Sequence, residues 1–327
     1  SQNRYGQQPQ NRGQYPNQQN RGNSGYNNRP NNSHHNPQNN HNNNHGGYPP
    51  PRQQTDVPYT AVANLGLLFN KLLYINETPA GNAELNYGIR EEANGHDIKA
   101  KLDALYAASK AQMTTSKALL APPEELGTDS ILLKTLYPGL YAGLGYRHGV
   151  PGDSADIKNG FSFDYTSGLP VLPASSVKGC LRSGLTEKKE DALCLMQQIF
   201  PACGLEAPDL QGLHDLVNTL FGPDAEKENT SLMKERIIFF DAYPVACDDR
   251  LLGPDYITPH PGNGLIEPKP IKMLKVCGGV TWRFPMLFPG NMAENKKTAL
   301  KLLFTQIMIG WGVGAKTNVG YGNLIEV

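Results

Sequence analysis

Apolar side chains recur at helical spacing soon after residue 56. The residues that would share one face of a first helix are Leu65, Leu68, Phe69, Leu72 and Leu73. A second helix is predicted from Asp97 to about Leu120 by the same periodicity. The pair Pro122-Pro123 ends it, because proline supplies no backbone N–H and disfavours helical geometry in the residue before it. The part from 55 to 130 is therefore predicted to be mainly helical.

Strand and helix patterns alternate from residue 131 onward. The predicted strands are 131–146, with a Pro-Gly interruption, 236–245, 279–288 and 323–327. The predicted helices are 175–185, 191–200, 210–221 and 294–310. This order of strand, helix, strand, strand, helix, strand fits an α+β sheet domain better than a doubly wound one.

Two connections in this region are unusual. A long loop at 147–173 leads into the helix that ends near Leu185, and we expect Ser175 or Ser176 to cap that helix, since a serine oxygen accepts an unpaired N–H of the first turn. About thirty residues separate the strand that ends at Val245 from the one that begins near Lys275. A connection of that length is usually functional or disordered.

The first 54 residues have a different composition. They hold five arginines but no lysine, aspartate or glutamate, and Asn and Gln supply 25 of them. They contain no Ala, Val, Ile, Leu, Met, Phe, Trp or Cys, so nothing is available to bury against the entropy of ordering the chain. We predict a disordered tail over 1–54 and a folded part over 55–327. The tail is either an RNA-attracting arm, through its arginines and tyrosines, or a solvated linker.

Charge and cysteine usage narrow the class of protein. The whole chain has zero net charge, and the part after residue 54 carries 25 basic and 30 acidic residues. No apolar run approaches a membrane span or a secretory signal, so a soluble cytoplasmic protein without membrane contact is expected. Five widely spaced cysteines without a C-x-x-C pair favour neither a disulfide framework nor a zinc cluster. We expect no cofactor and no metal.

A glycine-rich segment at 310–322 holds five glycines in thirteen positions. It is close to the consensus of a nucleotide-binding P-loop. A P-loop follows a strand and opens a helix, whereas this segment follows a helix and leads into a short strand, so we do not predict a nucleotide-binding loop. Glycines let a backbone present successive N–H groups to phosphate oxygens, and Lys316, Thr317 and Asn318 would add a charge and neutral donors. The alternative is a glycine-rich turn that closes an edge strand.

Three ordered motifs then carry a family resemblance. The segment Gly312-Val-Gly-Ala-Lys-Thr-Asn-Val-Gly-Tyr-Gly322 resembles the C-terminal G-x-G-x-K-x-x-x-G-x-G loop of the RAMP superfamily of CRISPR-associated RNA-binding proteins. The segment 163–183 is similar to that family's entry to its first helix, with Ala174 in place of the usual glycine. The segments 239–244, 255–260 and 269–272 resemble the sixth-subunit RAMP group of the type III-B (Cmr) effector complex.

The resemblance implies an RRM-like ferredoxin fold (βαββαβ) at 131–327 with helical insertions and a "thumb" insertion at about 246–274. It implies a non-catalytic backbone subunit for antiviral defence, which binds the 3′ region of a CRISPR guide RNA and the duplex of guide with target RNA. Its partners would be the repeated backbone subunit and the other 3′-end subunit of the complex. The candidate RNA-binding residues are Ser175, Ser176, Lys178, Arg182, Ile257, His260, Lys269, Lys272, Gly312, Gly314, Lys316, Thr317, Asn318, Gly320 and Gly322. Of these, Lys178, Arg182 and Lys316 would bind phosphates and would not recognise the RNA sequence.

Two other functions stay open. The protein could be a RAMP endoribonuclease that cleaves guide precursor or target RNA; the available groups are His148, His260, Asp153, Asp156 and Asp164. Alternatively, the tail could make it an RNA-binding scaffold protein. We expect no enzymatic activity.

Overall fold

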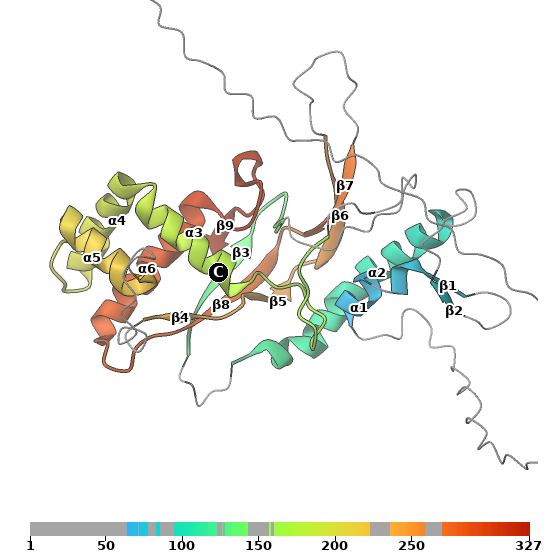
Figure 1. Ribbon diagram of the computed structural model, residues 1–327, viewed down its shortest axis with the longest axis horizontal. Coiled ribbons are helices and arrows are strands. Elements are labelled where there is room, and N and C mark those ends of the chain that lie inside the picture. The colour runs from blue at the N-terminus through green and yellow to red at the C-terminus, as the bar shows by residue number, and fades with distance from the viewer. Residues whose placement is uncertain are drawn as a thin grey trace, which may run out of the picture. The chain divides into compact units, whose positions relative to one another are not determined.

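A computed structural model provides the structure of the protein (Figure 1). The residues that it describes are 64–70, 72–77, 83–85, 95–122, 126, 128–142, 157, 160–222, 236–258 and 270–327. The chain divides into two units, 1–53 and 54–327, and every described residue lies in the second. The predicted tail and the candidates His148, Asp153, Asp156, His260 and Lys269 lie outside the described residues.

The centre of the fold is an antiparallel sheet. Its strands are β3 (Asp129–Thr135), β4 (Ile238–Phe239), β5 (Tyr243–Cys247), β8 (Val280–Leu287) and β9 (Leu324–Glu326). Strand β8 pairs with β3, β4 and β5, and β3 pairs with β9 on its other side. Residues Ile131, Leu133 and Thr135 of β3 are buried while Leu132 is exposed, as the two-residue period of a strand requires when one face packs on a core.

Four helices accompany this sheet. They are α3 (Ala174–Thr186), α4 (Lys189–Ala202), α5 (Leu210–Phe221) and α6 (Glu294–Trp311), which Figure 1 shows grouped together. The apolar stripe of α6, including Leu300, Phe304 and Ile307, is fully buried in one continuous core with α3, α4 and α5. The predicted mixed α+β class is confirmed, and the predicted helices at 191–200, 210–221 and 294–310 are present.

The N-terminal part of the folded unit is only partly as predicted. Its first helix, α1 (Leu65–Asn70), is shorter than expected and passes into the 3-10 turn η2 (Leu72–Tyr74). The second helix is confirmed as α2 (Gly95–Ser116) with the 3-10 turn η3 (Lys117–Leu120). Between them lies a short hairpin that the sequence analysis missed, β1 (Ile75–Glu77) with β2 (Ala83–Leu85).

Helix α2 and the 3-10 turn η3 that follows it contact the strand region through two lysines and one buried serine. Lys110 Nζ donates to the carbonyl of Asp248 at 2.6 Å, and Lys117 Nζ donates to the carbonyl of Val245 at 3.1 Å. Ser109 is fully buried and accepts a hydrogen bond from the amide of Leu252 at 3.3 Å. These hydrogen bonds join the N-terminal helical part to the segment that contains β5 and the start of β6.

The segments before α3 match the expectations only in part. The strand expected over 131–146 with a Pro-Gly interruption is confirmed up to Thr135, and the chain then turns at Pro138 and at Gly139, which has φ 116°; residues 143–146 lie outside the described residues. Neither Ser175 nor Ser176 caps the helix: α3 begins at Ala174, so both serines lie inside its first turn. The acceptor comes instead from a carboxylate distant in sequence, since Asp241 Oδ1 accepts from the amide of Ala174 at 2.7 Å.

The insertion between β5 and β8 contains a β-hairpin that the sequence analysis did not resolve. It consists of β6 (Leu252–Ile257) and β7 (Ile271–Val276), paired in antiparallel register with Leu252 opposite Val276 and Ile257 opposite Ile271. Its inner end is tied to the turn after β3, where the amide and carbonyl of Leu140 bond reciprocally with those of Val276.

No helix among the described residues is long and apolar enough to cross a membrane.

Candidate nucleic-acid interface

The glycine loop, Gly312–Gly322, begins where α6 ends. Gly312, Gly314, Gly320 and Gly322 all have positive φ, from 74° to 95°, a region that residues with a Cβ rarely occupy. A Cβ added to Gly314 would lie 2.6 Å from the carbonyl oxygen of Tyr141, and one added to Gly322 would collide with the carbonyl of Val313. Both the backbone conformation and the close approach of neighbouring chain therefore require glycine here.

Backbone hydrogen bonds fix the loop to the segment after β3. The amide of Val313 donates to the carbonyl of Gly322 at 3.0 Å, which closes the loop on itself. The amide of Ala315 donates to the carbonyl of Tyr141 at 2.6 Å, and that of Gly322 donates to the carbonyl of Gly139 at 2.8 Å. These bonds hold the loop in one conformation without using its outer edge.

Lys316 stands at the outer edge of this loop. Among the described residues it is the one non-glycine residue with positive φ (61°), and its exposed side chain makes no ion pair there. The amides of Gly314, Lys316, Thr317 and Asn318 likewise donate to no acceptor in the described part of the chain. A left-handed conformation costs an ordinary residue about 1–2 kcal/mol, and such strain gathers at functional sites. The loop thus combines a lysine on a fixed backbone with unused backbone donors.

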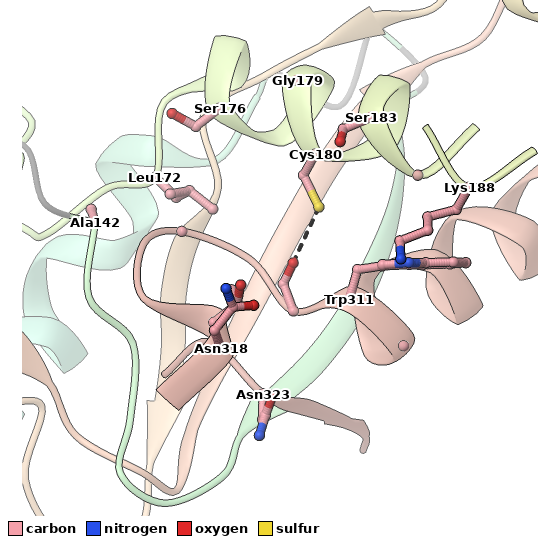
Figure 2. A pocket seen from close by; sticks show the side chains of 15 residues that line it. Ala142, Leu172, Ser176, Gly179, Cys180, Ser183, Lys188, Trp311, Asn318 and Asn323 are labelled. Carbon is pink, nitrogen blue, oxygen red and sulfur yellow. Dashed lines mark hydrogen bonds between the residues drawn. The ribbon is translucent and has the colours of Figure 1, made fainter. Parts of the chain in front are cut away.

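A groove of about 650 Å³ separates the glycine loop from α3 (Figure 2). The polar groups that line it are the side chains of Ser176, Ser183, Lys188, Thr317, Asn318 and Asn323, together with the indole of Trp311. No carboxylate and no imidazole is present among the described residues that line the groove. An anion entering it meets one ammonium group and neutral donors, and no fixed negative charge.

Cys180 connects the two walls of the groove. Its thiol donates to the carbonyl of Gly312 at 3.2 Å, the contact drawn as a dashed line in Figure 2. Burial raises the pKa of this thiol from 9.0 to about 11, because a thiolate would be poorly solvated there. Cys180 is therefore a protonated structural donor.

The structure divides the predicted site on α3 between two faces of the helix. Ser176 lines the groove together with Gly312, Gly314, Thr317 and Asn318.

The other three α3 candidates do not line the groove. Ser175, Lys178 and Arg182 are spaced three and four residues apart, so they share a different face of α3. The ammonium group of Lys178 lies 5.9 Å from the ring centroid of Phe221 on α5. Lys178 therefore lies beside α5 and outside the groove.

The β6–β7 hairpin packs against the glycine loop. Asp255 Oδ2 accepts from the hydroxyl of Tyr321 at 2.7 Å and from Lys275 Nζ at 2.6 Å. Burial acts to raise the pKa of Asp255, but the hydrogen bonds from Lys275 and Tyr321 outweigh it, and the pKa lies below its ordinary value. Burial and the bond to Asp255 raise the pKa of Tyr321, which stays a neutral donor.

The two candidates on the described part of the hairpin lie apart. Ile257 packs against the small buried cluster of Tyr141, Met273 and Tyr321. Lys272 pairs with Tyr256 across the hairpin, at a position that alternates with that of Ile257 and so belongs to the opposite face.

Several residues of this interface were missed in the sequence analysis. Lys188 carried no signal, since it lies between two helices in a run of charged residues. Asp255 and Lys275 are twenty positions apart and meet only because β6 and β7 pair. A strand assignment for 252–257 could have brought them together.

Of the groups proposed for cleavage, Asp164 alone lies in the described part of the chain. Asp164 Oδ2 accepts from the amide of Ser167 at 2.6 Å, so it closes a turn before α3. Within the described residues, no group of three or more His, Cys, Asp or Glu side chains could hold a metal ion.

Comparison with known proteins gives matches over this whole region. A family model described as RAMPs, the RAMP superfamily, matches residues 132–325. The chain is 28% identical over 169 residues to a protein of Saccharolobus solfataricus named CRISPR system CMR subunit Cmr6. That alignment covers 50% of this chain and 47% of the relative, so the match spans about half the length of the curated protein.

Two solved structures are also similar. A chain of the cryo-EM structure of the Type III-B Cmr-beta bound to cognate target RNA is 20% identical, with a TM-score of 0.47 over 81% of this chain and 88% of that one. The crystal structure of Cmr6 from Pyrococcus furiosus is 21% identical, with a TM-score of 0.32 over 61% of this chain and 97% of the other.

Proposed function

The chain belongs to the RAMP superfamily, and from this premise we propose that it is a Cmr6-type subunit of a type III-B CRISPR effector complex, where it binds guide RNA through its glycine loop and groove. The name of the Saccharolobus relative supports the subunit type. The bound RNA would be the 3′ region of the guide and the duplex that it forms with target RNA. The protein partners would be the repeated backbone subunit and the other 3′-end subunit.

One observation carries the proposal: Lys316, with its left-handed backbone, and four amides, all without partners in the described part of the chain, stand beside a groove whose described lining has no negative charge. Lys316 and the amides of Gly314, Thr317 and Asn318 offer donors to phosphate oxygens. Donors that contact phosphate rather than base edges hold RNA without regard to its sequence. That property suits a subunit that must accept guides with different spacers.

We infer that the same scaffold is a ferredoxin-like βαββαβ core within a RAMP domain at 55–327. The chain order β3, α3, β5, β8, α6, β9 supports this arrangement, with α4, α5 and the β6–β7 hairpin as insertions. The hairpin corresponds to the thumb that would lie on the guide–target duplex. The tail at 1–54 would add arginines that attract RNA.

We further propose that this subunit does not cut RNA. The engagement of Asp164 in a turn and the neutral or cationic lining of the groove support a binding role over an acid–base or metal-assisted one. An endoribonuclease remains the alternative outcome of the experiment below.

The test compares two adjacent lysines. Lys188 lines the groove, whereas Lys189 is an exposed first residue of α4 outside it. In fluorescence anisotropy with a guide-like RNA, Lys188→Ala should weaken binding several-fold and reduce the salt slope by about one, as loss of a phosphate contact predicts, while Lys189→Ala should have little effect.

The same proteins assembled with the other subunits are then tested for cleavage of target RNA. Retained cleavage in the Lys188→Ala complex at saturating RNA agrees with a binding role. Equal affinities for the two variants would reject the groove as the RNA site. Cleavage by the isolated wild-type chain would favour the nuclease.

A further inference from the structure

The turn that follows β3 exposes an aromatic ring beside the glycine loop. Tyr137 is 89% exposed, although a tyrosine ring normally gains free energy by burial. Lys275 Nζ lies 5.8 Å from the centroid of this ring, a cation–π contact on one face. Lys275 is itself held by Asp255 at 2.6 Å, and its side chain is only 13% exposed. One face of the ring is thus supported by a fixed cation, and the exposure leaves the other open.

This turn is fixed to the glycine loop on both sides of Tyr137. The amide of Leu136 donates to the carbonyl of Asn323 at 2.9 Å, and Gly139 accepts from the amide of Gly322 at 2.8 Å. Pro138 lies close to the loop, since a Cβ added to Gly320 would lie 3.5 Å from its Cδ atom. The ring therefore stands at a set position next to the loop that carries Lys316.

We propose that Tyr137 is a stacking platform for one unpaired RNA base, next to the backbone phosphates held by the glycine loop; this rests on the proposed function. Every base presents a π-face, so stacking on an aromatic side chain tolerates any sequence. A base inside a duplex already has both faces covered by its neighbours, so the open face of Tyr137 suits an unpaired or terminal base. The ion pair with Lys275 offsets the charge of Asp255, so this carboxylate adds little repulsion toward RNA phosphates.

The test uses guide-like RNAs with the fluorescent base 2-aminopurine at successive positions near the 3′ end. The proteins are the full wild-type chain, Tyr137→Phe and Tyr137→Leu. Stacking should change the emission at one position in the wild type and in Tyr137→Phe, which keeps the ring, and Tyr137→Leu should abolish that change. The affinity of Tyr137→Leu should fall between about 5-fold and 150-fold, the range for one lost base–aromatic stack. An abasic site at the reporting position should weaken wild-type binding and leave Tyr137→Leu unaffected.

The outcomes separate this inference from the proposed function. If no variant and no wild-type protein binds RNA, the proposed function fails. If RNA binds with the expected salt dependence but Tyr137→Leu changes neither affinity nor emission at any position, the platform is overturned while the function stands. Unchanged RNA binding with impaired assembly would assign the ring to a protein contact and also overturn it. Thermal melting of the variants checks the fold, which a change at so exposed a side chain should leave intact.

Discussion

The hydroxyl of Tyr321 donates a 2.7 Å hydrogen bond to Oδ2 of Asp255, so the glycine loop and the β6–β7 hairpin are joined by side chains as well as by backbone. Lys275 reaches the same oxygen from the neighbouring strand at 2.6 Å and supports the ring of Tyr137 at 5.8 Å. A displacement of the hairpin would therefore disturb both the loop and the exposed ring. We therefore expect a change in phosphate binding at the loop to alter the contacts made by the hairpin, and a change at the hairpin to alter phosphate binding.

The first prediction concerns the energy of this bond. In a double-mutant cycle, Tyr321→Phe and Asp255→Asn should show a coupling of about 1 kcal/mol in the free energy of unfolding, because the bond has a charged acceptor and is partly buried. Urea unfolding of the four proteins measures it. A cycle that closes additively would show that the hydroxyl and the carboxylate do not stabilise each other.

The second prediction is a dependence of stability on pH. The pKa of Asp255 is depressed below its ordinary value of 3.8, so the stabilisation it gives is present above that value and is lost as pH falls through the lower, folded-state pKa. Between pH 5 and pH 2 the wild type should therefore lose more unfolding free energy than Asp255→Asn. Parallel pH curves for the two proteins would contradict a depressed pKa at this carboxyl.

The third prediction compares two glycines near the groove. Gly314→Ala should destabilise the protein by more than about 1 kcal/mol, because φ is 85° and the new Cβ would lie 2.6 Å from the carbonyl oxygen of Tyr141. Gly310→Ala meets nothing within 4 Å and lies in α6, so it should stabilise by about 0.5–1 kcal/mol. Thermal unfolding distinguishes the two, and equal effects would mean that the loop relaxes around the added methyl group.

The glycine pattern shows how far sequence reasoning reaches. It predicted a loop that depends on glycine, and Gly312, Gly314, Gly320 and Gly322 all adopt positive φ, which glycine takes at little steric cost. The amphipathic period of α6 likewise specified its buried face, since one apolar stripe must face the core. Local conformational preference and periodicity were sufficient for these elements.

Contacts between residues far apart in the sequence could not be predicted in this way. The acceptor at the start of α3 is Asp241, which no pattern near Ser175 or Ser176 reveals because a folded chain supplies it from 67 residues away. The division of α3 into two faces follows from helix geometry, yet which face meets the glycine loop depends on packing against α6. Lys178 could therefore be recognised as a cation but not placed relative to Lys316.

The fourth prediction concerns the reactivity of cysteines. Because burial raises the pKa of Cys180 from 9.0 to about 11, its thiolate fraction at pH 8 should be about a hundredfold smaller than that of an ordinary thiol. Iodoacetamide should label the exposed Cys194 first, as peptide mass spectrometry would show. Comparable initial rates at both sites would indicate that the α3–loop contact opens readily in solution.

The same shift affects stability in alkali. A raised pKa means that the stabilisation linked to the protonated Cys180 is complete below pH 9 and is lost as pH rises through about 11. Cys180→Ser should show less of this alkaline loss, because a hydroxyl does not ionise in that range and can still donate to the carbonyl of Gly312.

The fifth prediction separates charge from backbone strain at Lys316. Both Lys316→Gly and Lys316→Ala remove the ammonium group, but only glycine adopts φ 61° without a steric cost. The glycine variant should therefore be more stable than the alanine variant by about 1 kcal/mol, and at least as stable as the wild type. Both should weaken RNA binding to a similar extent for every guide sequence and lower the salt slope by about one. The contrary result is a glycine variant that is more stable than the wild type and binds RNA as tightly. In that case the strain at Lys316 would serve no role in binding. Lys188 and the loop amides alone would then have to make the phosphate contact.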